Sequence, residues 1–276
     1  MKKYIFFSLL LFQILFVSGK GLLGKFSSTF HPGDTLKYEF KWKWVFFIPS
    51  IKAGELSIKY VGMENFRDQF LDKEIQVLHF LAIAKSSGTL LKVAGITIRD
   101  EFDIYVKPQN FCTILFVQNI QEGKRRNLII ERFFSSRKKL LYRKFKIVDK
   151  KFYVAQRELF IKNYPPIIHD PASIFFFLPI FCKNNNNLKI PIDFNGKFRI
   201  FNVKFKEDGF KKTIFKESQK TWKITVKNVF GGIKKGHGRL SIYFVKTPVM
   251  IPIFLDIKVK YGKVRGYLKE FIRHKK

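Results

Sequence analysis

Hydrophobic and polar residues alternate with a period of two along most of the chain beyond residue 35. Segment 36–44 places Leu, Tyr, Phe, Trp and Trp on one face and only Lys or Glu on the other, and segment 55–60 repeats this alternation. Such a pattern is typical of a strand that buries one face of an antiparallel sheet. The chain is therefore predicted to be all-β.

Further strands are predicted wherever the same alternation recurs between turn residues. These segments are 75–84, 90–96, 100–106, 112–120, 127–134, 141–148, 188–194, 197–205, 221–229, 238–244 and 253–261. Asn195-Gly196 separates two of them and favours a tight hairpin, because a type I′ turn needs positive φ at both central residues. We expect one antiparallel sheet curled into an open or closed barrel.

One short helix is predicted near residues 170–178. Asp170 is a good N-cap, and Pro171 suits the first helical position, where its missing N–H costs nothing. The apolar residues 174–178 continue the helix, and Pro179 is expected to stop it.

The N-terminus has the layout of a secretory signal. Lys2 and Lys3 precede an apolar run over residues 4–17, and small residues lead to Gly19. The run is shorter than the ~20 residues that a membrane-spanning helix needs. We expect residues 1–19 to be a cleaved signal peptide and residues 20–276 a single β-rich domain, exported to the periplasm or envelope of a Gram-negative-type bacterium. An uncleaved anchor is the alternative.

The chain is strongly basic, with 53 Lys and Arg against 21 Asp and Glu and a net charge of +32. Such a charge attracts polyanions, among them phosphorylated lipid head groups and anionic glycans. Nucleic acid fits the charge, but the export signal argues against it as a physiological partner. A low-GC genome is a second explanation, since Lys, Phe, Ile and Asn share A/T-rich codons.

Basic residues cluster in predicted turns. The clusters Lys124-Arg125-Arg126 and Lys234-Lys235 lie where they could form a cationic rim around one mouth of a barrel. If the basic residues converge they make an anion-binding rim, with peripheral membrane contact as one consequence, and if they are spread evenly they only keep the protein soluble.

Aromatic residues are abundant, with 34 Phe in the chain. Trp42 and Trp44, together with Phe175, Phe176 and Phe177, are candidates for the lining of an apolar cavity of the kind that barrel mouths offer to lipids. Ordinary core packing is the simpler interpretation of the same residues.

Catalytic and metal-binding motifs are not found in the sequence. The five histidines are scattered without ligand spacing, so we expect no metal and no cofactor. His169 beside Asp170 suggests acid–base chemistry, but capping by Asp170 explains the pair more simply. Glu101 and Asp103 share one strand face, as paired carboxylates of a glycoside hydrolase would, although a solvated ion-paired face is the commoner case. We expect a protein without enzymatic activity.

Cys112 and Cys182 are the two cysteines of the chain. An exported protein can oxidise them, so one disulfide is possible, and two buried thiols are the alternative.

Several short motifs occur in a characteristic order along the chain. They are 33–42 (Gly-Asp-Thr-Leu-Lys-Tyr-Glu-Phe-Lys-Trp), 53–56 (Ala-Gly-Glu-Leu), 99–103 (Arg-Asp-Glu-Phe-Asp), 169–173 (His-Asp-Pro-Ala-Ser) and a closing strand pair over 252–268 with Tyr261-Gly262-Lys263 between. In these motifs the chain resembles a family of exported bacterial proteins known as the domain of unknown function 3108. The resemblance implies an envelope location and a β architecture, and it leaves the activity open because the family has no assigned reaction.

Two classes of function fit these observations. The first is a non-catalytic carrier for a lipid or anionic envelope glycolipid, with an apolar interior and a cationic rim. The second is a structural or assembly factor that docks on other envelope proteins through its aromatic segments.

Overall fold

The computed structural model describes residues 19–43, 50–68, 73–88, 97–148, 151–161, 164–165, 167–182, 187–194, 196–212, 214, 218–227, 238–245, 250–258 and 262–274. The strands are β1 (Thr35–Lys43), β2 (Ile51–Asp68), β3 (Lys73–Ser86), β4 (Arg99–Val106), β5 (Thr113–Glu122), β6 (Arg125–Phe134), β7 (Lys139–Val148), β8 (Lys151–Ile161), β9 (Asn187–Phe194), β10 (Lys197–Lys212), β11 (Ser218–Lys227), β12 (Arg239–Val245), β13 (Pro252–Lys258) and β14 (Lys263–Ile272).

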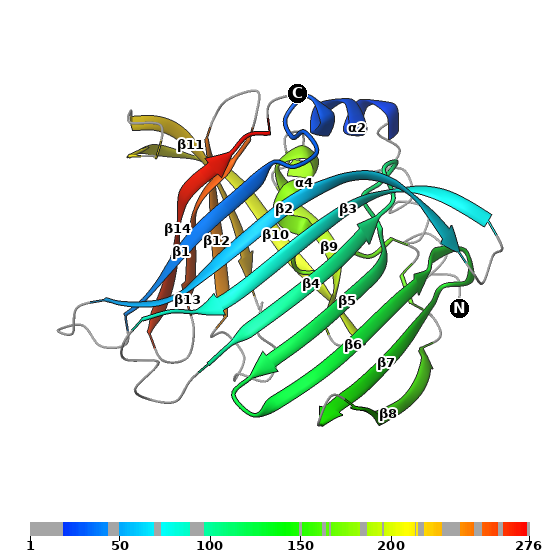
Figure 1. The fold of residues 1–276 in the computed structure, drawn as a ribbon. Coiled ribbons are helices and arrows are strands. Elements are labelled where there is room, and N and C mark those ends of the chain that lie inside the picture. Colours follow the sequence, from blue (N-terminus) through cyan, green and yellow to red (C-terminus); the bar gives the residue numbers. More distant parts are fainter. Residues whose placement is uncertain are drawn as a thin grey trace, which may run out of the picture.

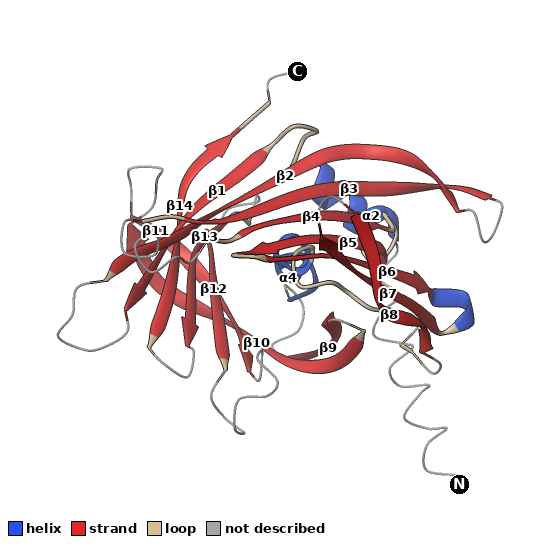
Figure 2. Ribbon diagram, turned by 60° about the horizontal axis from the view of Figure 1, so that its bottom comes forward, coloured by secondary structure: helices blue, strands red, loops and turns tan. Residues whose placement is uncertain are grey.

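The described strands form one 14-stranded antiparallel sheet in the order β8-β7-β6-β5-β4-β3-β2-β1-β14-β13-β12-β11-β10-β9. Two meanders, β1 to β8 and β9 to β14, meet where β1 pairs with β14 (Figure 1). The sheet curls into an open barrel whose two edges are β8 and β9 (Figure 2). The prediction of an all-β, antiparallel, barrel-like fold is confirmed.

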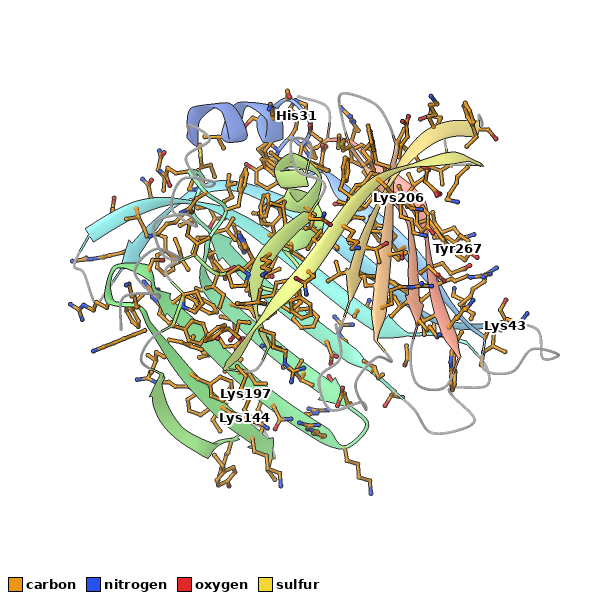
Figure 3. All side chains as sticks on the ribbon, turned by 180° about the vertical axis from the view of Figure 1, so that it is seen from behind. His31, Lys43, Lys144, Lys197, Lys206 and Tyr267 are labelled. Atoms are coloured by element: carbon orange, nitrogen blue, oxygen red, sulfur yellow. The ribbon has the colours of Figure 1, made fainter. Side chains whose placement is uncertain are left out.

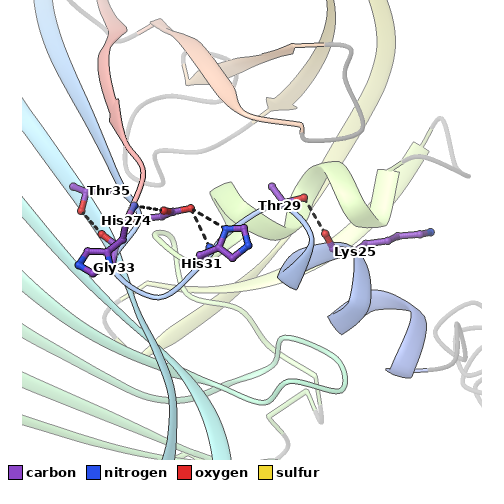
Figure 4. Close-up of polar contacts among 7 residues, drawn as sticks. Lys25, Thr29, His31, Gly33, Thr35 and His274 are labelled. Atoms are coloured by element: carbon purple, nitrogen blue, oxygen red, sulfur yellow. Dashed lines mark hydrogen bonds and ion pairs between the residues drawn. The ribbon is translucent and has the colours of Figure 1, made fainter. Parts of the chain in front are cut away.

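The pairing of β1 with β14 is reinforced by Asp34, which lies just before β1. One carboxylate oxygen of Asp34 accepts the backbone N–H of His31 (3.0 Å), and the other accepts that of His274 (2.9 Å), beyond β14 (Figure 4). Gly33 adopts a positive φ of 93°, and a Cβ there would lie 2.7 Å from the His274 ring. The buried Asp34 thus ties the first strand to the last.

Residues 167–170, the linker before the interior helix, connect β5 with the edge strand β9 through backbone hydrogen bonds. Ile168 accepts the backbone N–H of Thr113 at the start of β5 (2.9 Å), and His169 exchanges two backbone hydrogen bonds with β9 (3.1 and 2.9 Å). The linker therefore supplies backbone partners to both halves of the open sheet and leads directly into the interior helix.

That helix, α4 (Ile174–Cys182), packs on the inner face of the sheet. Asp170 is its N-cap: Oδ1 accepts the backbone N–H groups of Ala172 (2.8 Å) and Ser173 (2.7 Å), with Pro171 in the turn between cap and helix. The Oδ2 atom of Asp170 accepts the Thr113 hydroxyl (2.8 Å), which fixes the cap to β5.

The prediction that Pro179 stops this helix is wrong, because α4 continues to Cys182. An interior proline costs about 3 kcal/mol. The second turn buries Leu178 (1% exposed) and packs Ile180 against the core. Each buried aliphatic side chain contributes roughly 1.5–3 kcal/mol, which offsets the cost of the proline.

Two further elements were not predicted. Helix α2 (Gly19–Ser27) begins at the expected signal-cleavage site, and a short 3-10 turn, η1, covers Ser135–Arg137. Strand β8 was also missed, because its sequence lacks a regular alternation and its pairing with β7 contains two register shifts. The predicted signal peptide before Gly19 and the predicted strand 90–96 lie outside the described residues. Among the helices that the structure describes, none is long and apolar enough to cross a membrane.

Candidate functional site

The helices close one end of the curled sheet with packed aromatic rings; we call it the helix end. Phe26 of α2 is fully buried and contacts Phe111 and Phe177, and the rings of Phe111 and Phe177 stack with centroids 3.9 Å apart. Phe176 of α4 stacks on Phe80 of β3 at 4.9 Å. This end of the interior is therefore a dense apolar core.

Two of the predicted cavity residues belong to this core. Phe176 is 4% exposed and Phe177 is 0% exposed, and both pack against neighbouring rings. The side chain of Phe175 lies outside the described residues. The structure thus places Phe176 and Phe177 at the helix end, away from Trp42 near the other end of β1.

The opposite strand ends differ, and we call them the exposed end. An inner row of apolar side chains crosses five neighbouring strands in direct register here: Trp42, Val264, Ile257, Leu240 and Val226. The first four are only partly buried, whereas Val226 is 4% exposed. The inner row therefore lies where the interior begins to meet solvent.

Burial deepens one step from the inner row toward the helix end. The next register positions on the same face include Leu255 (2% exposed), Ile242 (0%) and Ile224 (0%). Gly266 lies among them opposite Phe40, and a Cβ at Gly266 would come within 2.7 Å of the Phe40 ring. The inner face thus changes from partly exposed to densely packed within two residues along each strand.

A cationic row lies beside the inner row, one residue nearer the strand ends. Its members are Lys43, Lys263, Lys258 and Arg239, each directly opposite the next across β1, β14, β13 and β12. The backbone of Lys227 on β11 continues this register, but its side chain lies outside the described residues. Because neighbouring side chains along a strand point to opposite faces, these cations belong to the outer face. Within the described part of the chain, Arg239, Lys258 and Lys263 are exposed and form no ion pair.

Like charges placed directly opposite one another destabilise a sheet by several tenths of a kcal/mol per pair. None of the four register positions carries an acid. Lys263, Lys258 and Arg239 therefore repel one another at one defined place in the sheet.

Acids on the neighbouring outer face of β1 and β13 contact other cations. Glu39 lies within 3.7 Å of Lys41 and Lys52 and 3.6 Å of Lys269, and Lys52 also contacts Glu55 at 2.6 Å. Asp256 reaches Arg265 at 3.5 Å. Figure 3 shows Lys43 and Tyr267 on this side of the molecule, where β1 and β14 run together.

One of the two predicted basic clusters, at residues 124–126, lies within the described residues. Lys124, Arg125 and Arg126 are exposed at the β5–β6 turn, which is at the same end of the strands as the cationic row (lower left in Figure 1). Arg125 also contacts Glu122 at 3.4 Å. Lys234 and Lys235, between β11 and β12 in the sequence, lie outside the described residues. Trp44, which follows β1, also lies outside them.

The inner face of the other half of the sheet carries buried polar groups. Glu131 of β6 is 0% exposed and accepts the side-chain amide of Gln118 (2.9 Å) and the backbone N–H of Gly196 (2.6 Å). Asp193 of β9 accepts the hydroxyl of Tyr164 and, at 3.3 Å, the same Gly196 N–H. Gly196 has a positive φ of 76°, and Asn195, the other residue of the predicted turn, lies outside the described residues.

Burial raises the pKa of Glu131 well above its ordinary value, and the negative charge of Asp193 raises it further. Two carboxyl groups this close in an apolar interior are best accommodated when one of them keeps its proton. The pair therefore joins β6 to β9 across the inside of the curl.

Asn127 lies four residues before Glu131 on β6, and even spacing puts both on the inner face. It is 4% exposed, and its Nδ2 has no hydrogen-bond partner among the residues that the structure describes. Leaving a buried donor unpaired costs about 1–3 kcal/mol. Asn127 lies near the start of β6, on the exposed-end side of the interior.

The carboxylates considered for catalysis are engaged on the outer face. Asp103 contacts His79 at 2.9 Å, and Glu101 contacts Arg99 at 2.9 Å. A second acid, Glu64, contacts the other ring nitrogen of His79 at 2.8 Å. Among the described residues, no cluster of three or more His, Cys, Asp or Glu could hold a metal ion.

His169 and Asp170 do not face one another as an acid–base pair. The Nδ1 atom of His169 contacts the carbonyl of Phe111 at 2.9 Å, while Asp170 caps α4. Burial lowers the pKa of His169 to about 4, so its ring stays neutral.

Cys112 is completely buried beside the linker, and its Sγ accepts the backbone N–H of Ile168 at 3.4 Å. Burial raises the pKa of its thiol. The side chain of Cys182 lies outside the described residues, so a disulfide between the two stays a prediction.

The two rows were not predicted from the sequence. Their signal is present in the sequence as five pairs of adjacent apolar and basic residues, at 42–43, 226–227, 239–240, 257–258 and 263–264. Only strand register shows that these pairs are neighbours.

Comparison with known proteins gives a family and a fold. The model of the family described as "Protein of unknown function (DUF3108)" matches residues 38–269. A crystal structure of a β-barrel-like protein of domain of unknown function DUF1849 from Brucella abortus is similar, with a TM-score of 0.54 and 10% identity over 90% of this chain and 100% of that chain. This likeness concerns the fold alone. No curated protein matches the chain.

Proposed function

The chain belongs to DUF3108, a family of proteins of unknown function, and from that premise we propose that it is a non-catalytic binding or carrier protein of the bacterial cell envelope. Its ligand class is an anionic amphiphile, a lipid or glycolipid. The hydrocarbon part lies against the inner row, and the charged head group lies at the cationic row.

One observation carries this proposal: on four neighbouring strands, β1, β14, β13 and β12, the inner apolar residue and the outer cation are adjacent in the chain. Trp42 with Lys43 and Leu240 with Arg239 are examples. An amphiphile has an apolar chain next to an anionic head group. A single molecule can therefore place its chain against the apolar inner row and its head group against the cationic row. Burial of its chain would be favourable by about 0.8 kcal/mol per CH₂ group.

Two other features support it. The helix end is packed with aromatic rings, which limits how far a chain can enter. The Nδ2 atom of Asn127, unpaired among the described residues, offers a donor to an ester or amide carbonyl between the chain and the head group.

The test is native mass spectrometry of the protein purified from cells that express the full chain. A near-stoichiometric co-purified amphiphile is expected, and the stripped protein should rebind lysophosphatidylglycerol more tightly than lysophosphatidylcholine. The variant Leu240→Ala/Ile257→Ala removes side chains of the inner row and should lower retention at least tenfold.

A matched control is Leu81→Ala/Ile83→Ala. Both residues are partly buried, but they lie on the outer face of β3, since Phe80 and Ala82 belong to the inner core. Retention should be unchanged in this control. Equal retention by both double variants would contradict the proposal.

An assembly factor that docks on other envelope proteins is the second candidate. It is favoured by the exposed aromatic side chains Phe152 (61%) and Tyr153 (52%) on the edge strand β8 and by Phe210 (67%) on β10. Two results together would favour this function. The protein would neither carry nor rebind an amphiphile, and it would copurify with one envelope protein, an association that the variant Phe152→Ser/Tyr153→Ser abolishes.

A further inference from the structure

We infer that the cationic row is a docking surface for an anionic lipid bilayer, which turns the exposed end of the sheet toward the membrane. This inference rests on the proposed function and deepens it. It names the membrane as the place where the protein would take up or deliver an amphiphile.

The exposed cations of this surface lie in a line across the sheet. Lys263, Lys258 and Arg239 are exposed, lie directly opposite one another across β14, β13 and β12, and form no ion pair within the described part of the chain. Lys43 continues the row on β1. Facing cations repel one another, and an anionic surface laid across them converts that repulsion into attraction.

The row is longer than a single head group. Neighbouring strands lie about 4.8 Å apart, so a row across four strands extends roughly 14 Å. A single phosphate group spans only a fraction of this length and would contact one or two of the side chains. A bilayer presents many head groups in one plane and can engage all of them together.

The cationic row lies at the end of the sheet where the inner face is partly exposed. The cations lie at the strand ends, and the inner row begins one residue further along each strand. Contact at the cationic row therefore brings the partly exposed side chains of Trp42, Val264 and Ile257 close to the bilayer. The basic residues Lys124, Arg125 and Arg126, at the same end of the strands, add charge of the same sign.

The test is flotation of the purified full-length product with vesicles. Binding to phosphatidylglycerol vesicles, none to phosphatidylcholine vesicles, and loss of binding at raised NaCl concentration are expected. Each basic residue near an anionic surface contributes about fivefold to partitioning, so Arg239→Gln/Lys258→Gln/Lys263→Gln should lower it about a hundredfold.

The matched control is Lys59→Gln/Lys220→Gln/Arg273→Gln, which removes the same charge from exposed positions toward the helix end. This control should change partitioning less than fivefold. Equal losses in the two triple variants, or no loss in the first, would overturn the docking surface. Binding of soluble polyphosphate that depends on the row, without any binding to vesicles, would also overturn it in favour of a soluble polyanion.

The two proposals fail separately. Leu240→Ala/Ile257→Ala should still float with phosphatidylglycerol vesicles while losing its amphiphile. Vesicle binding by a protein that never retains an amphiphile overturns the carrier function and supports docking, whereas retention without vesicle binding overturns docking alone.

Discussion

Glu131 of β6 and Asp193 of β9 share one backbone donor: the N–H of Gly196 lies 2.6 Å from the first carboxylate and 3.3 Å from the second. The two strands stand far apart in the order of the sheet, so their contact crosses the inside of the curl. It holds the β9–β10 hairpin against β6 where the sheet itself does not close. Gln118 and Tyr164 also donate hydrogen bonds to the pair. Burial, together with the neighbouring carboxyl groups, raises the pKa of the Tyr142 phenol.

Glu131 should make the protein less stable as the pH rises. The folded state keeps a proton on Glu131 that the unfolded chain releases above about pH 4.3. Folding therefore takes up a proton, and the free energy of unfolding falls as the pH rises from there toward the folded-state pKa. Glu131→Gln should flatten this slope and raise stability at neutral pH by about 1–3 kcal/mol, measured by urea denaturation. Glu101→Gln, at an exposed ion pair, is the control, and a wild-type slope in Glu131→Gln would contradict the prediction.

His169 should make the protein less stable as the pH falls. Its pKa is lowered to about 4, so the unfolded chain binds a proton below about pH 6.5 that the folded protein does not. The free energy of unfolding should therefore fall as the pH drops from about 6.5 to about 4. His169→Gln keeps a donor for the Phe111 carbonyl and should remove this loss. His274→Gln, at an exposed histidine, is the control and should keep the loss of stability. The measurement is the free energy of unfolding of both variants across this pH range.

Gly266 should tolerate no side chain. A Cβ there would lie 2.7 Å from the Phe40 ring and 3.1 Å from Leu255, in the packed layer behind the inner row. Gly266→Ala should lower the thermal midpoint and cost about 1–3 kcal/mol. Gly24→Ala in α2, where nothing lies within 4 Å, should instead stabilise by up to about 1 kcal/mol. Equal effects of the two substitutions would show that the layer is looser than the structure indicates.

Replacing Asn127 by an apolar residue should raise stability and weaken binding of the amphiphile. Asn127→Leu removes a buried donor that lacks a partner among the described residues, so the ligand-free protein should gain about 1 kcal/mol. If the amide bonds a carbonyl of the amphiphile, retention in native mass spectrometry should drop roughly five- to tenfold at the same time. A gain in stability without a loss of retention would remove Asn127 from the binding surface.

The sequence by itself determined the strands and their faces. Alternation in 36–44 and 100–106 predicted β1 and β4 to within one residue, and Asp170 with Pro171 marked the start of the interior helix. These features are local, since side-chain periodicity and capping depend on residues a few positions apart. Where local rules were outweighed by packing, at Pro179, or disturbed by register shifts, at β8, the sequence was insufficient.

Only the tertiary structure decided which residues meet. Lys43 and Lys263, or Glu131 and Asp193, are far apart in the chain, and nothing in their neighbourhoods specifies the partner strand. Register across the β1–β14 junction aligns four apolar–basic pairs into two rows, and the curl of the sheet brings β9 against β6. The physical reason is that strand pairing depends on backbone hydrogen bonds that are the same at every residue. The choice of partners is therefore made by the packing of the whole sheet around its core.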